Sequence, residues 1–316
     1  MGEPSRRAVV TGGAGFVGSW LCETLLGRGM HVLCVDSLIT GSKHNVAHLV
    51  DDPAFEMLWL DVSEGLALEG RVDLVMHLAS PASPVDYQRH QLETLRVGSL
   101  GTMHALELAR RSDARFVLAS TSEVYGDPLQ HPQSETYWGN VNPVGPRSMY
   151  DEAKRFAEAL TTAYREVHRV RTGIARIFNT YGPRMRSDDG RVVPTFIRQA
   201  LNGQRLTVAG DGSQTRSICY VTDLVAGLVA LAMSEEPGPV NLGNPEESTV
   251  LALAERISAL TGRRAQVKSV SLPVDDPQRR CPDISLARAL LNWSPKVTAD
   301  NGLRQTIEWF RRHPER

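Results

Sequence analysis

The stretch Ala8-Val-Val-Thr-Gly-Gly-Ala-Gly-Phe-Val-Gly18 decides the fold of this chain. Its apolar start predicts a buried strand, and residues 19–26 that follow it are typical of a helix. Three glycines suit the turn between them, because such a turn must be tight, let a pyrophosphate approach the backbone, and let the helix pack on the strand. The free N–H groups at the start of a helix also favour phosphate. We therefore predict dinucleotide contacts from Gly12, Gly15, Phe16, Val17 and Gly18.

A second apolar run ends in Asp36, eighteen residues after Gly18. A carboxylate at this spacing is expected to accept hydrogen bonds from the adenosine ribose. It would repel a 2′-phosphate, so we predict NAD rather than NADP as the cofactor. The alternative is a glycine turn that binds no ligand, and Asp61, a candidate adenine contact, could equally cap a turn. The further cofactor contacts that we expect are Ser37, Asp61, Val62, Leu78, Ala79 and Ser80.

Apolar, β-branched runs alternate with helical segments through the first half of the chain. Strands that alternate with helices imply right-handed crossovers and a parallel sheet covered on both faces. We predict an α/β fold of the Rossmann type, with a doubly wound parallel sheet. The expected strands are residues 8–11, 31–36, 74–78 and 115–120, and the expected long helices are residues 92–111 and 150–168.

The pattern changes from about residue 173, where shorter elements are joined by loops rich in Gly, Pro and Arg. We predict an NAD-binding domain over residues 1–176 and a smaller C-terminal α/β domain, for the substrate, over residues 177–316. The pattern allows the chain to return once to the large domain, at about residues 217–234. The expected elements are strands 174–178 and 205–208 and helices 194–202, 221–233, 250–261, 285–291 and 302–312.

The composition of the 316 residues is ordinary for a globular enzyme, and the formal net charge of -1 indicates neither a nucleic-acid partner nor an acidic membrane surface. The longest apolar stretch, residues 225–233, is far below the roughly 20 residues that span a bilayer. No signal peptide is evident, so we expect a cytoplasmic protein. The cysteines are scattered, without metal-ligand spacing, which predicts neither a disulfide framework nor a metal site; they are Cys22, Cys34, Cys219 and Cys281.

The catalytic candidates follow the fourth strand, whose end reads ASTSEVYG over residues 119–126. Open α/β sheets bind ligands at the carboxyl ends of their strands. Tyr150 and Lys154 are spaced four residues apart, on one face of the helix that comes next. A neighbouring ammonium and a positively charged nicotinamide favour the phenolate, so Tyr150 can take a proton from a sugar hydroxyl. This pair alone also occurs by chance on surface helices, and its meaning here depends on the glycine turn.

Together these segments resemble the extended short-chain dehydrogenase/reductase family, and within it the UDP-glucuronate decarboxylases, or UDP-xylose synthases. The resemblance runs over nearly the whole chain. It is carried by residues 77–84 (HLASPASP), 119–128 (ASTSEVYGDP), 131–135 (HPQSE), 137–139 (YWG), 142–147 (NPVGPR), 175–185 (ARIFNTYGPRM), 189–193 (DGRVV), 214–217 (QTRS), 241–247 (NLGNPEE) and 282–284 (PDI).

The resemblance implies that Tyr150, held by Lys154 and Thr121, removes the C4 hydroxyl proton of UDP-glucuronate while NAD takes the C4 hydride. The 4-keto product is a β-keto acid, which loses carbon dioxide readily, and return of the hydride gives UDP-xylose. Ser122 and Glu123 are expected near the sugar carboxylate and C5. Arg280 is expected to guide the carboxylate and to supply the C5 proton, the alternative being a surface ion pair with Asp275 or Asp276.

The resemblance also places a diphosphate against Asn179, Arg191 and Arg216. An arginine suits a diphosphate because its fork can bond two oxygens at once, although each arginine alone would be interpreted as a solvated charge. Tyr87 and Arg96 are weaker candidates for the sugar end of the site.

Several positions depart from the family pattern. Gly98 replaces an Asn that supports the active-site helix and a proton-relay water, Pro194 and Thr195 replace Ser-Asn, Ala209 replaces an aromatic residue, and Cys281 replaces Lys. These changes lead to the hypothesis that some UDP-4-keto-pentose leaves, with NADH, before the hydride returns.

Three alternatives remain at this stage. The 4,6-dehydratases usually carry an Asp where this chain has Ser122, and 4-epimerases generally lack the glutamate and the arginine that face a carboxylate. A UDP-glucuronate 4-epimerase is the nearest enzyme alternative, and a non-catalytic NAD sensor is an alternative of another class. The resemblance further implies a homodimer, formed by a four-helix bundle of residues 92–111 and 150–168 from each copy.

Overall fold

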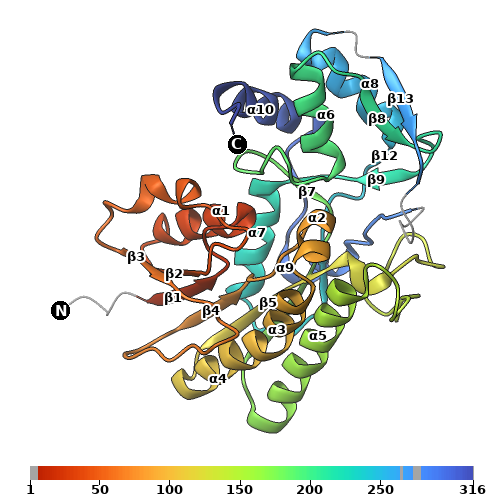
Figure 1. Ribbon diagram of the computed structural model, residues 1–316. Helices are drawn as coiled ribbons and strands as arrows, with labels where there is room; N and C mark the ends of the chain where they lie inside the picture. Colours follow the sequence, from red (N-terminus) through yellow and green to blue (C-terminus); the bar gives the residue numbers. More distant parts are fainter. Residues whose placement is uncertain (1–5, 264–265, 273–278, 316) are drawn as a thin grey trace.

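Seven strands form one parallel sheet at the centre of the computed structural model (Figure 1). The structure describes residues 6–263, 266–272 and 279–315. The strand order is β11-β6-β5-β4-β1-β2-β3, so the direction of winding reverses at β1 and crossovers lie on both faces. The strands are β1 (Arg7–Thr11), β2 (His31–Asp36), β3 (Phe55–Trp59), β4 (Leu74–His77), β5 (Arg115–Thr121), β6 (Thr172–Ile177) and β11 (Val240–Leu242).

Alternate side chains of each strand enter two separate cores, because successive side chains point to opposite faces of a sheet. Ala8 and Val10 of β1 join the core under α1 (Phe16–Leu26) and α7 (Val221–Ala232). Val9 joins the core under α4 (Thr102–Ser112) and α5 (Ser148–His168). Both faces of the sheet are thus covered by helices, and the predicted doubly wound fold is confirmed.

The prediction of a single helix over residues 92–111 is wrong in one respect. It is divided into α3 (Gln91–Arg96), a π-helical turn at Val97–Gly101, and α4. Two glycines, Gly98 and Gly101, lie in the turn, where they weaken the regular helix. A Cβ atom on Gly98 would lie 2.6 Å from the Cβ of Ala153 in α5, so this glycine lets the two helices approach closely.

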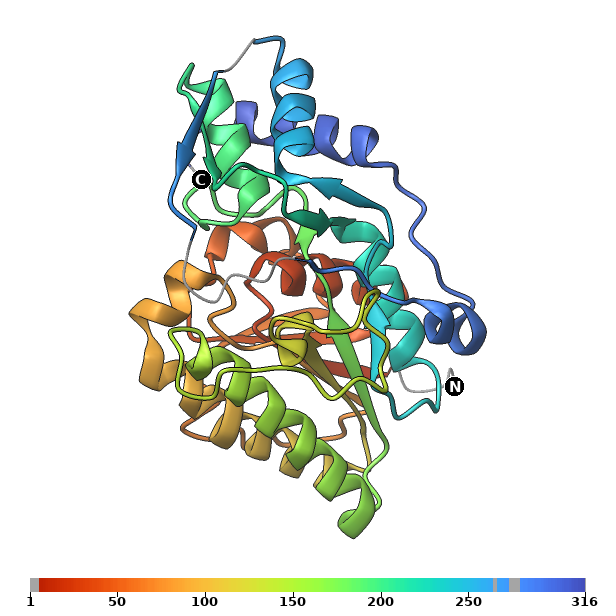
Figure 2. The ribbon, with the colours of Figure 1, turned by 90° about the vertical axis from the view of Figure 1, so that its right-hand side faces the viewer.

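A smaller lobe lies above the sheet in Figure 1. The view turned by 90° in Figure 2 shows the helices of this lobe above the ends of the strands. Helices α6, α8 and α10 pack together in it. They are accompanied by three two-stranded sheets, β7–β10, β8–β13 and β9–β12. Its elements are β7 (Thr180–Tyr181), α6 (Val192–Leu201), β8 (Leu206–Ala209), β9 (Thr215–Ser217), β10 (Cys219–Tyr220), β12 (Glu247–Thr249), α8 (Val250–Thr261), β13 (Val267–Val270) and α10 (Ala299–Arg312).

The chain returns from this lobe to the sheet. Helix α7 packs on β5 and β6, and β11 pairs in parallel with β6. Helix α9 (Ser285–Leu291) then packs on α7 and β11 after a second excursion into the lobe. The interval 217–234 that the sequence allowed for a return contains α7, and β11 lies beyond it. None of the described helices is long and apolar enough to cross a membrane.

The sequence did not predict several short elements. Helix α2 (Pro84–Arg89) begins at Ser83, whose hydroxyl accepts a hydrogen bond from the Asp86 amide at 3.2 Å. The described residues also form three short 3₁₀ helices, η1 (Lys43–Asn45), η2 (Ala47–Leu49) and η4 (Ser122–Tyr125). These pieces are too short to show a helical period, yet α2 and η4 both bring side chains to the site described next.

Candidate active site

A cavity of about 540 Å³ lies between the carboxyl ends of the central strands and the smaller lobe. Its wall on the sheet side is made by the β1–α1 turn, the ends of β2, β4 and β5, and the start of α5. Residues between 177 and 218 make most of the opposite wall. The cavity therefore lies where a doubly wound sheet is expected to bind its ligand.

The glycine turn has the close backbone packing that the sequence predicted. Gly12 has a φ of +70°, which favours glycine. A Cβ atom on Gly18 would lie 2.1 Å from the carbonyl oxygen of Gly12, so no side chain fits there. Gly15 is the N-cap of α1 and provides no side-chain cap. The first N–H groups of α1 thus lie at the cavity wall, where a phosphate could accept from them.

Asp36 is fixed at the end of β2. Its carboxylate accepts hydrogen bonds from the backbone N–H groups of Ala14, at 2.9 Å, and Leu38, at 2.8 Å. The side chain lines the cavity, and burial raises its pKa. Because a carboxylate offers about four acceptor positions, it can accept further bonds from a ribose. The glycine turn and this carboxylate together fit NAD.

The other predicted cofactor residues lie around the same cavity. Those on its wall are Gly12, Gly15, Phe16, Val17, Gly18, Asp36, Ser37, Asp61, Val62, Leu78, Ala79, Ser80, Tyr150 and Lys154. The structure thus brings together in space a set that is spread over more than 140 positions of the sequence.

Tyr150 and Lys154 project from the first turns of α5. The Lys154 ammonium donates a hydrogen bond to the Ala119 carbonyl at 2.9 Å and lies 5.8 Å from the centre of the Tyr150 ring. Burial lowers the pKa of Lys154 to about 8. Burial and the Glu123 carboxylate raise the pKa of Tyr150 to about 12, although hydrogen bonding with Thr121 lowers it. The protein groups alone therefore favour the neutral phenol, and the predicted phenolate depends on the positive charge of the nicotinamide.

The end of β5 supplies the other predicted catalytic groups. Thr121 caps the short helix η4, because its hydroxyl accepts from the Glu123 amide at 3.1 Å. Thr121 and Ser122 are both buried and line the cavity. Glu123 lies in η4, and its side chain meets residues from two distant segments.

Glu123 lies between two arginines. The Arg280 guanidinium binds the Glu123 carboxylate through two N–H groups, and Arg147 Nη2 donates to the same carboxylate at 2.7 Å. Burial would raise the pKa of Glu123, but the two cations outweigh it and lower the pKa to about 2. The carboxylate is therefore ionised at neutral pH. Asp275 and Asp276, the alternative partners of Arg280, lie outside the described residues.

Tyr87 of α2 packs directly on the catalytic tyrosine. The rings of Tyr87 and Tyr150 are stacked, with centroids 5.2 Å apart. The guanidinium carbon of Arg147 lies over the Tyr87 ring, 5.9 Å from its centroid. Tyr87 is 1% exposed, and its hydroxyl has no hydrogen-bond partner among the described residues. A buried hydroxyl of this kind is suited to bond a ligand in the cavity.

Asn179, Arg191 and Arg216 all line the cavity, as a diphosphate site requires. Arg191 is held by Asp189, with N–O distances of 2.6 Å and 2.9 Å. Arg96 is different, because it is exposed at the end of α3 and is absent from the cavity wall. The structure thus brings together every predicted substrate residue except Arg96.

Sequence reasoning missed Arg147. It was part of the family segment 142–147, but nothing in the sequence indicates that it reaches Glu123, twenty-four residues earlier. Its position one turn before Tyr150 was the only available signal. The ion pair of Arg186 with Asp86, at 2.8 Å, was missed for the same reason, and both of its members line the cavity.

The departures from the family pattern fall in three places. Pro194, Thr195 and Ala209 line the cavity on the side of the smaller lobe. Gly98 lies behind α5, against Ala153. Cys281 is buried next to Arg280 but outside the cavity wall. Only the first group can touch a molecule bound in this cavity.

The chain belongs to the NAD dependent epimerase/dehydratase family, whose profile matches residues 8–243. More narrowly, it is 52% identical over 311 residues to UDP-glucuronic acid decarboxylase 1 of Arabidopsis thaliana, covering 98% of this chain and 71% of that protein. It is 54% identical over 305 residues to UDP-glucuronic acid decarboxylase 4 of the same plant, covering 96% and 68%. UDP-glucuronic acid decarboxylase 1 of Xenopus tropicalis is 52% identical, covering 98% and 73%.

Solved structures agree in fold. The UDP-glucose 4-epimerase of Thermotoga maritima, in complex with UDP-glucose, aligns with a TM-score of 0.90 and 26% identity, over 98% of this chain and 100% of that one. The UDP-glucuronic acid 4-epimerase of Bacillus cereus, in complex with UDP-glucuronic acid and NAD, aligns with a TM-score of 0.86 and 28% identity, over 97% and 99%.

Proposed function

We propose that this chain is a UDP-glucuronate decarboxylase, which converts UDP-glucuronate to UDP-xylose through a 4-keto intermediate. The observation that carries the proposal is Glu123 between Arg147 and Arg280, in the same cavity as Tyr150 and Lys154. Cationic groups beside an oxidation site suit a substrate that carries a carboxylate. Relatives about half identical over nearly the whole chain are decarboxylases of this substrate by name.

The proposal assigns NAD to residues 1–176 and the nucleotide sugar mainly to residues 177–316. Bound NAD would supply a hydride acceptor at C4 of the sugar and a positive ring charge beside Tyr150. The glycine turn would hold the pyrophosphate and Asp36 the ribose. Asn179, Arg191 and Arg216 would hold the diphosphate of the sugar nucleotide, since all three lie on the cavity wall.

In the oxidation step, the phenolate oxygen of Tyr150, formed when bound NAD places its positive ring beside it, would take the proton of the C4 hydroxyl. Thr121 holds the phenol by a hydrogen bond, and the stacked ring of Tyr87 fixes its orientation. Lys154 supports the step from its buried position in α5, where its ammonium donates a hydrogen bond to the Ala119 carbonyl. General base catalysis of this kind typically contributes 10²–10⁴-fold.

In the decarboxylation step, Arg280 and Arg147 orient the uronate carboxylate, and Glu123 controls how strongly they bind it. Glu123 is ionised and occupies both guanidinium groups, so the substrate carboxylate must share them. Weak pairing favours loss of carbon dioxide, because a carboxylate held strongly in the ground state would react more slowly. Ser122 lies at the same end of the cavity, and protonation at C5 occurs there with Arg280 as the expected donor.

A test is to incubate the purified protein with NAD and UDP-glucuronate labelled with ¹³C at C6, and to follow the products by NMR. The proposal expects labelled carbon dioxide and UDP-xylose, and Tyr150→Phe is the inactive control. UDP-galacturonate with the label retained would identify a 4-epimerase instead. No turnover with wild-type protein that binds NAD normally would support a sensor.

The same experiment tests the return of the hydride. Pro194, Thr195 and Ala209 alter the wall of the smaller lobe, and we propose that part of the UDP-4-keto-pentose leaves before it is reduced. NADH absorbance should then rise during turnover, together with a keto-pentose signal in the NMR spectrum. UDP-xylose alone, with no NADH, would contradict this part of the proposal.

We further propose a homodimer formed by α3, α4 and α5. Large apolar side chains are exposed on these helices and on the π-helical turn between α3 and α4, which suits a helical interface with a second copy; they are Leu92, Leu95, Leu100, Met103, Phe156 and Val167. Light scattering after gel filtration measures the mass directly, and Phe156→Glu should convert the dimer to a monomer.

We also propose a cytoplasmic location, because all four cysteines are free thiols.

A further inference from the structure

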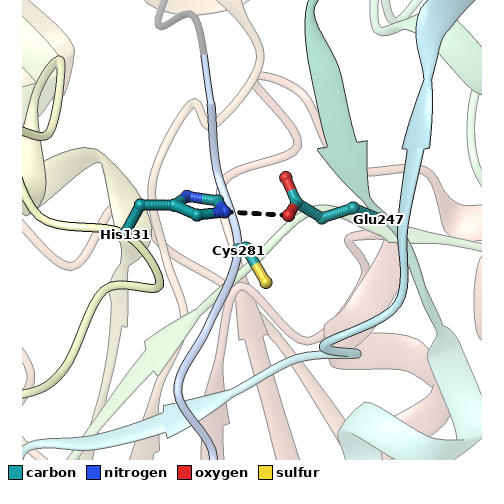
Figure 3. A group of neighbouring side chains, drawn as sticks. All are labelled: His131, Glu247 and Cys281. Carbon is teal, nitrogen blue, oxygen red and sulfur yellow. Dashed lines mark hydrogen bonds and ion pairs between the residues drawn. The ribbon is translucent and has the colours of Figure 1, made fainter.

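Three potential metal ligands meet outside the active-site cavity. The imidazole of His131, the carboxylate of Glu247 and the thiol of Cys281 offer ligand atoms that all lie within 4.8 Å of one another. Figure 3 shows the His131 ring pointing at Glu247, with the Cys281 side chain beside them. His131 Nε2 and Glu247 Oε2 are 2.9 Å apart. No predicted catalytic or cofactor residue is among the three.

The fold holds these three side chains in place through their neighbours. Gln133 and Cys281 exchange backbone and side-chain hydrogen bonds, with Gln133 N to Cys281 O at 2.9 Å and Cys281 N to Gln133 Oε1 at 2.8 Å. The Thr215 hydroxyl donates to Glu247 Oε1 at 2.5 Å, which fixes the carboxylate on the β9–β12 pair. The three ligands therefore come from segments that the backbone already joins.

The donor set suits a divalent transition metal of the zinc class. Zinc binds thiolate, imidazole and carboxylate ligands tetrahedrally, with bonds of about 2.0–2.3 Å. Ligand atoms around such an ion lie roughly 3.5 Å apart, so small side-chain rotations would close the present arrangement. His131 and Glu247 are 28% and 26% exposed at their side chains, which gives a metal ion a path from solvent.

We propose that His131, Glu247 and Cys281 form a metal-binding site for Zn²⁺ or a similar divalent ion. Three protein ligands bind the ion and a water molecule completes the tetrahedron. The Cys281 thiol loses its proton to solvent on binding, as metal ligation by cysteine requires. The sequence predicted no metal site, because these ligands lie 116 and 34 positions apart and share no local spacing.

The family resemblance implies that this site is not part of the family pattern. Cys281 stands where that pattern has lysine, and a protonated lysine has no lone pair to offer a metal. The site also adjoins the catalytic machinery, since Cys281 follows Arg280 directly. A bound ion would tie the segment that carries Arg280 to the loop at His131 and to β12, and would thereby resist its displacement.

Cobalt(II) is the probe, because a cysteine thiolate bound to Co²⁺ gives a charge-transfer band and tetrahedral coordination gives strong visible bands. Co²⁺ is titrated into chelator-treated wild-type protein without substrate. We expect one Co²⁺ per chain and both sets of bands, bleached by added Zn²⁺. Cys281→Ser should remove the charge-transfer band, and His131→Ala should weaken Co²⁺ binding by about tenfold or more.

The chain offers a matched control. His48 and Glu23 form another exposed histidine–glutamate pair, at 3.1 Å, with no cysteine beside it among the described residues. His48→Ala should leave the Co²⁺ spectrum unchanged. Thermal unfolding followed by circular dichroism, without metal, establishes that each variant is folded before its spectrum is compared.

A second measurement does not depend on cobalt. Zn²⁺ should slow the alkylation of Cys281 by iodoacetamide in the wild type, measured by mass spectrometry of the peptide, and should raise the unfolding temperature. The proposal is overturned if excess Co²⁺ gives no thiolate band, or if the band persists in Cys281→Ser. Neither readout uses turnover, so failure here would leave the proposed decarboxylase activity intact.

Discussion

The rings of Tyr87 and Tyr150 are stacked almost in parallel, with an interplanar angle of 10°. The pair comes from two helices, α2 and α5, so the orientation of the proposed base depends on a residue sixty-three positions earlier in the chain. Stacking accounts for the ring of Tyr87 but not for its hydroxyl, which is buried without a partner among the described residues.

Tyr87→Phe should separate these two roles. It keeps the stacked ring and removes a buried hydroxyl that makes no bond to the described residues, so the unfolding temperature should hold or rise slightly. If the hydroxyl contacts the sugar, KM for UDP-glucuronate should rise several-fold with little change in kcat. Steady-state kinetics and thermal unfolding measure both, and an unchanged KM would remove Tyr87 from the substrate contacts.

Glu123→Gln should lower the free energy of unfolding. It leaves Arg147 and Arg280 buried without their counter-charge, which we expect to lower the unfolding free energy by roughly 3 kcal/mol at pH 7. The pKa of Glu123 is lowered from 4.5 to about 2, so its contribution is present above pH 4.5 and is lost as the pH falls toward 2. Urea unfolding of wild type and variant should converge over that interval. A constant difference between the two unfolding free energies would show that the arginines do not lower the pKa of Glu123.

Lys154→Met should reveal the cost of burying an ammonium. Because burial lowers the pKa of Lys154 from 10.5 to about 8, the unfolded chain binds more protons between these values, and stability rises with pH there. The wild type should therefore gain roughly 3 kcal/mol on the variant between pH 8 and 10.5. Urea titrations across this range test the slope. Parallel curves for the two proteins would contradict the lowered pKa.

Gly98→Ala should push α5 away from the π-helical turn. The added Cβ would lie 2.6 Å from the Cβ of Ala153, and overpacking of this kind costs about 1–3 kcal/mol. Because α5 carries Tyr150 and Lys154, kcat should fall as well. The double variant Gly98→Ala/Ala153→Gly removes the closest contact but leaves the backbone oxygen of residue 153 at 3.1 Å from the added Cβ, so it should recover part of the lost kcat. Additive effects in this double-mutant cycle would show that the two residues do not interact.

The sequence was sufficient for the fold because its first half repeats one pattern, in which buried strands alternate with amphipathic helices. The glycine turn, Asp36 and the Tyr150–Lys154 spacing are local features, and the structure places all of them on one cavity. The π-helical turn at Gly98 was missed because a helical period continues across it. Residue Arg96 was expected in the cavity and is exposed, since the turn of α3 that carries it faces away.

The contacts that the sequence could not reveal are long-range ones between charged or polar side chains. Arg147 reaches Glu123, Arg186 reaches Asp86, and His131 reaches Glu247, each across a separation that no local pattern encodes. Charged residues in loops look alike in a sequence, whether they are solvated or paired in a buried site. Only the fold decides which of them meet.

Because the chain returns to the sheet through α7 and β11, the two lobes cannot be separated by a single cut in the chain. A fragment cut after residue 176 would end inside β6 and lack β11, so it would leave Ala175 and Arg176 of β6 without their partner strand, and an unpaired strand edge invites aggregation. The smaller lobe likewise cannot be exchanged as one contiguous insert, because several crossings join it to the sheet. Grafting a new substrate preference onto this scaffold therefore calls for point changes in the cavity wall rather than for lobe swapping.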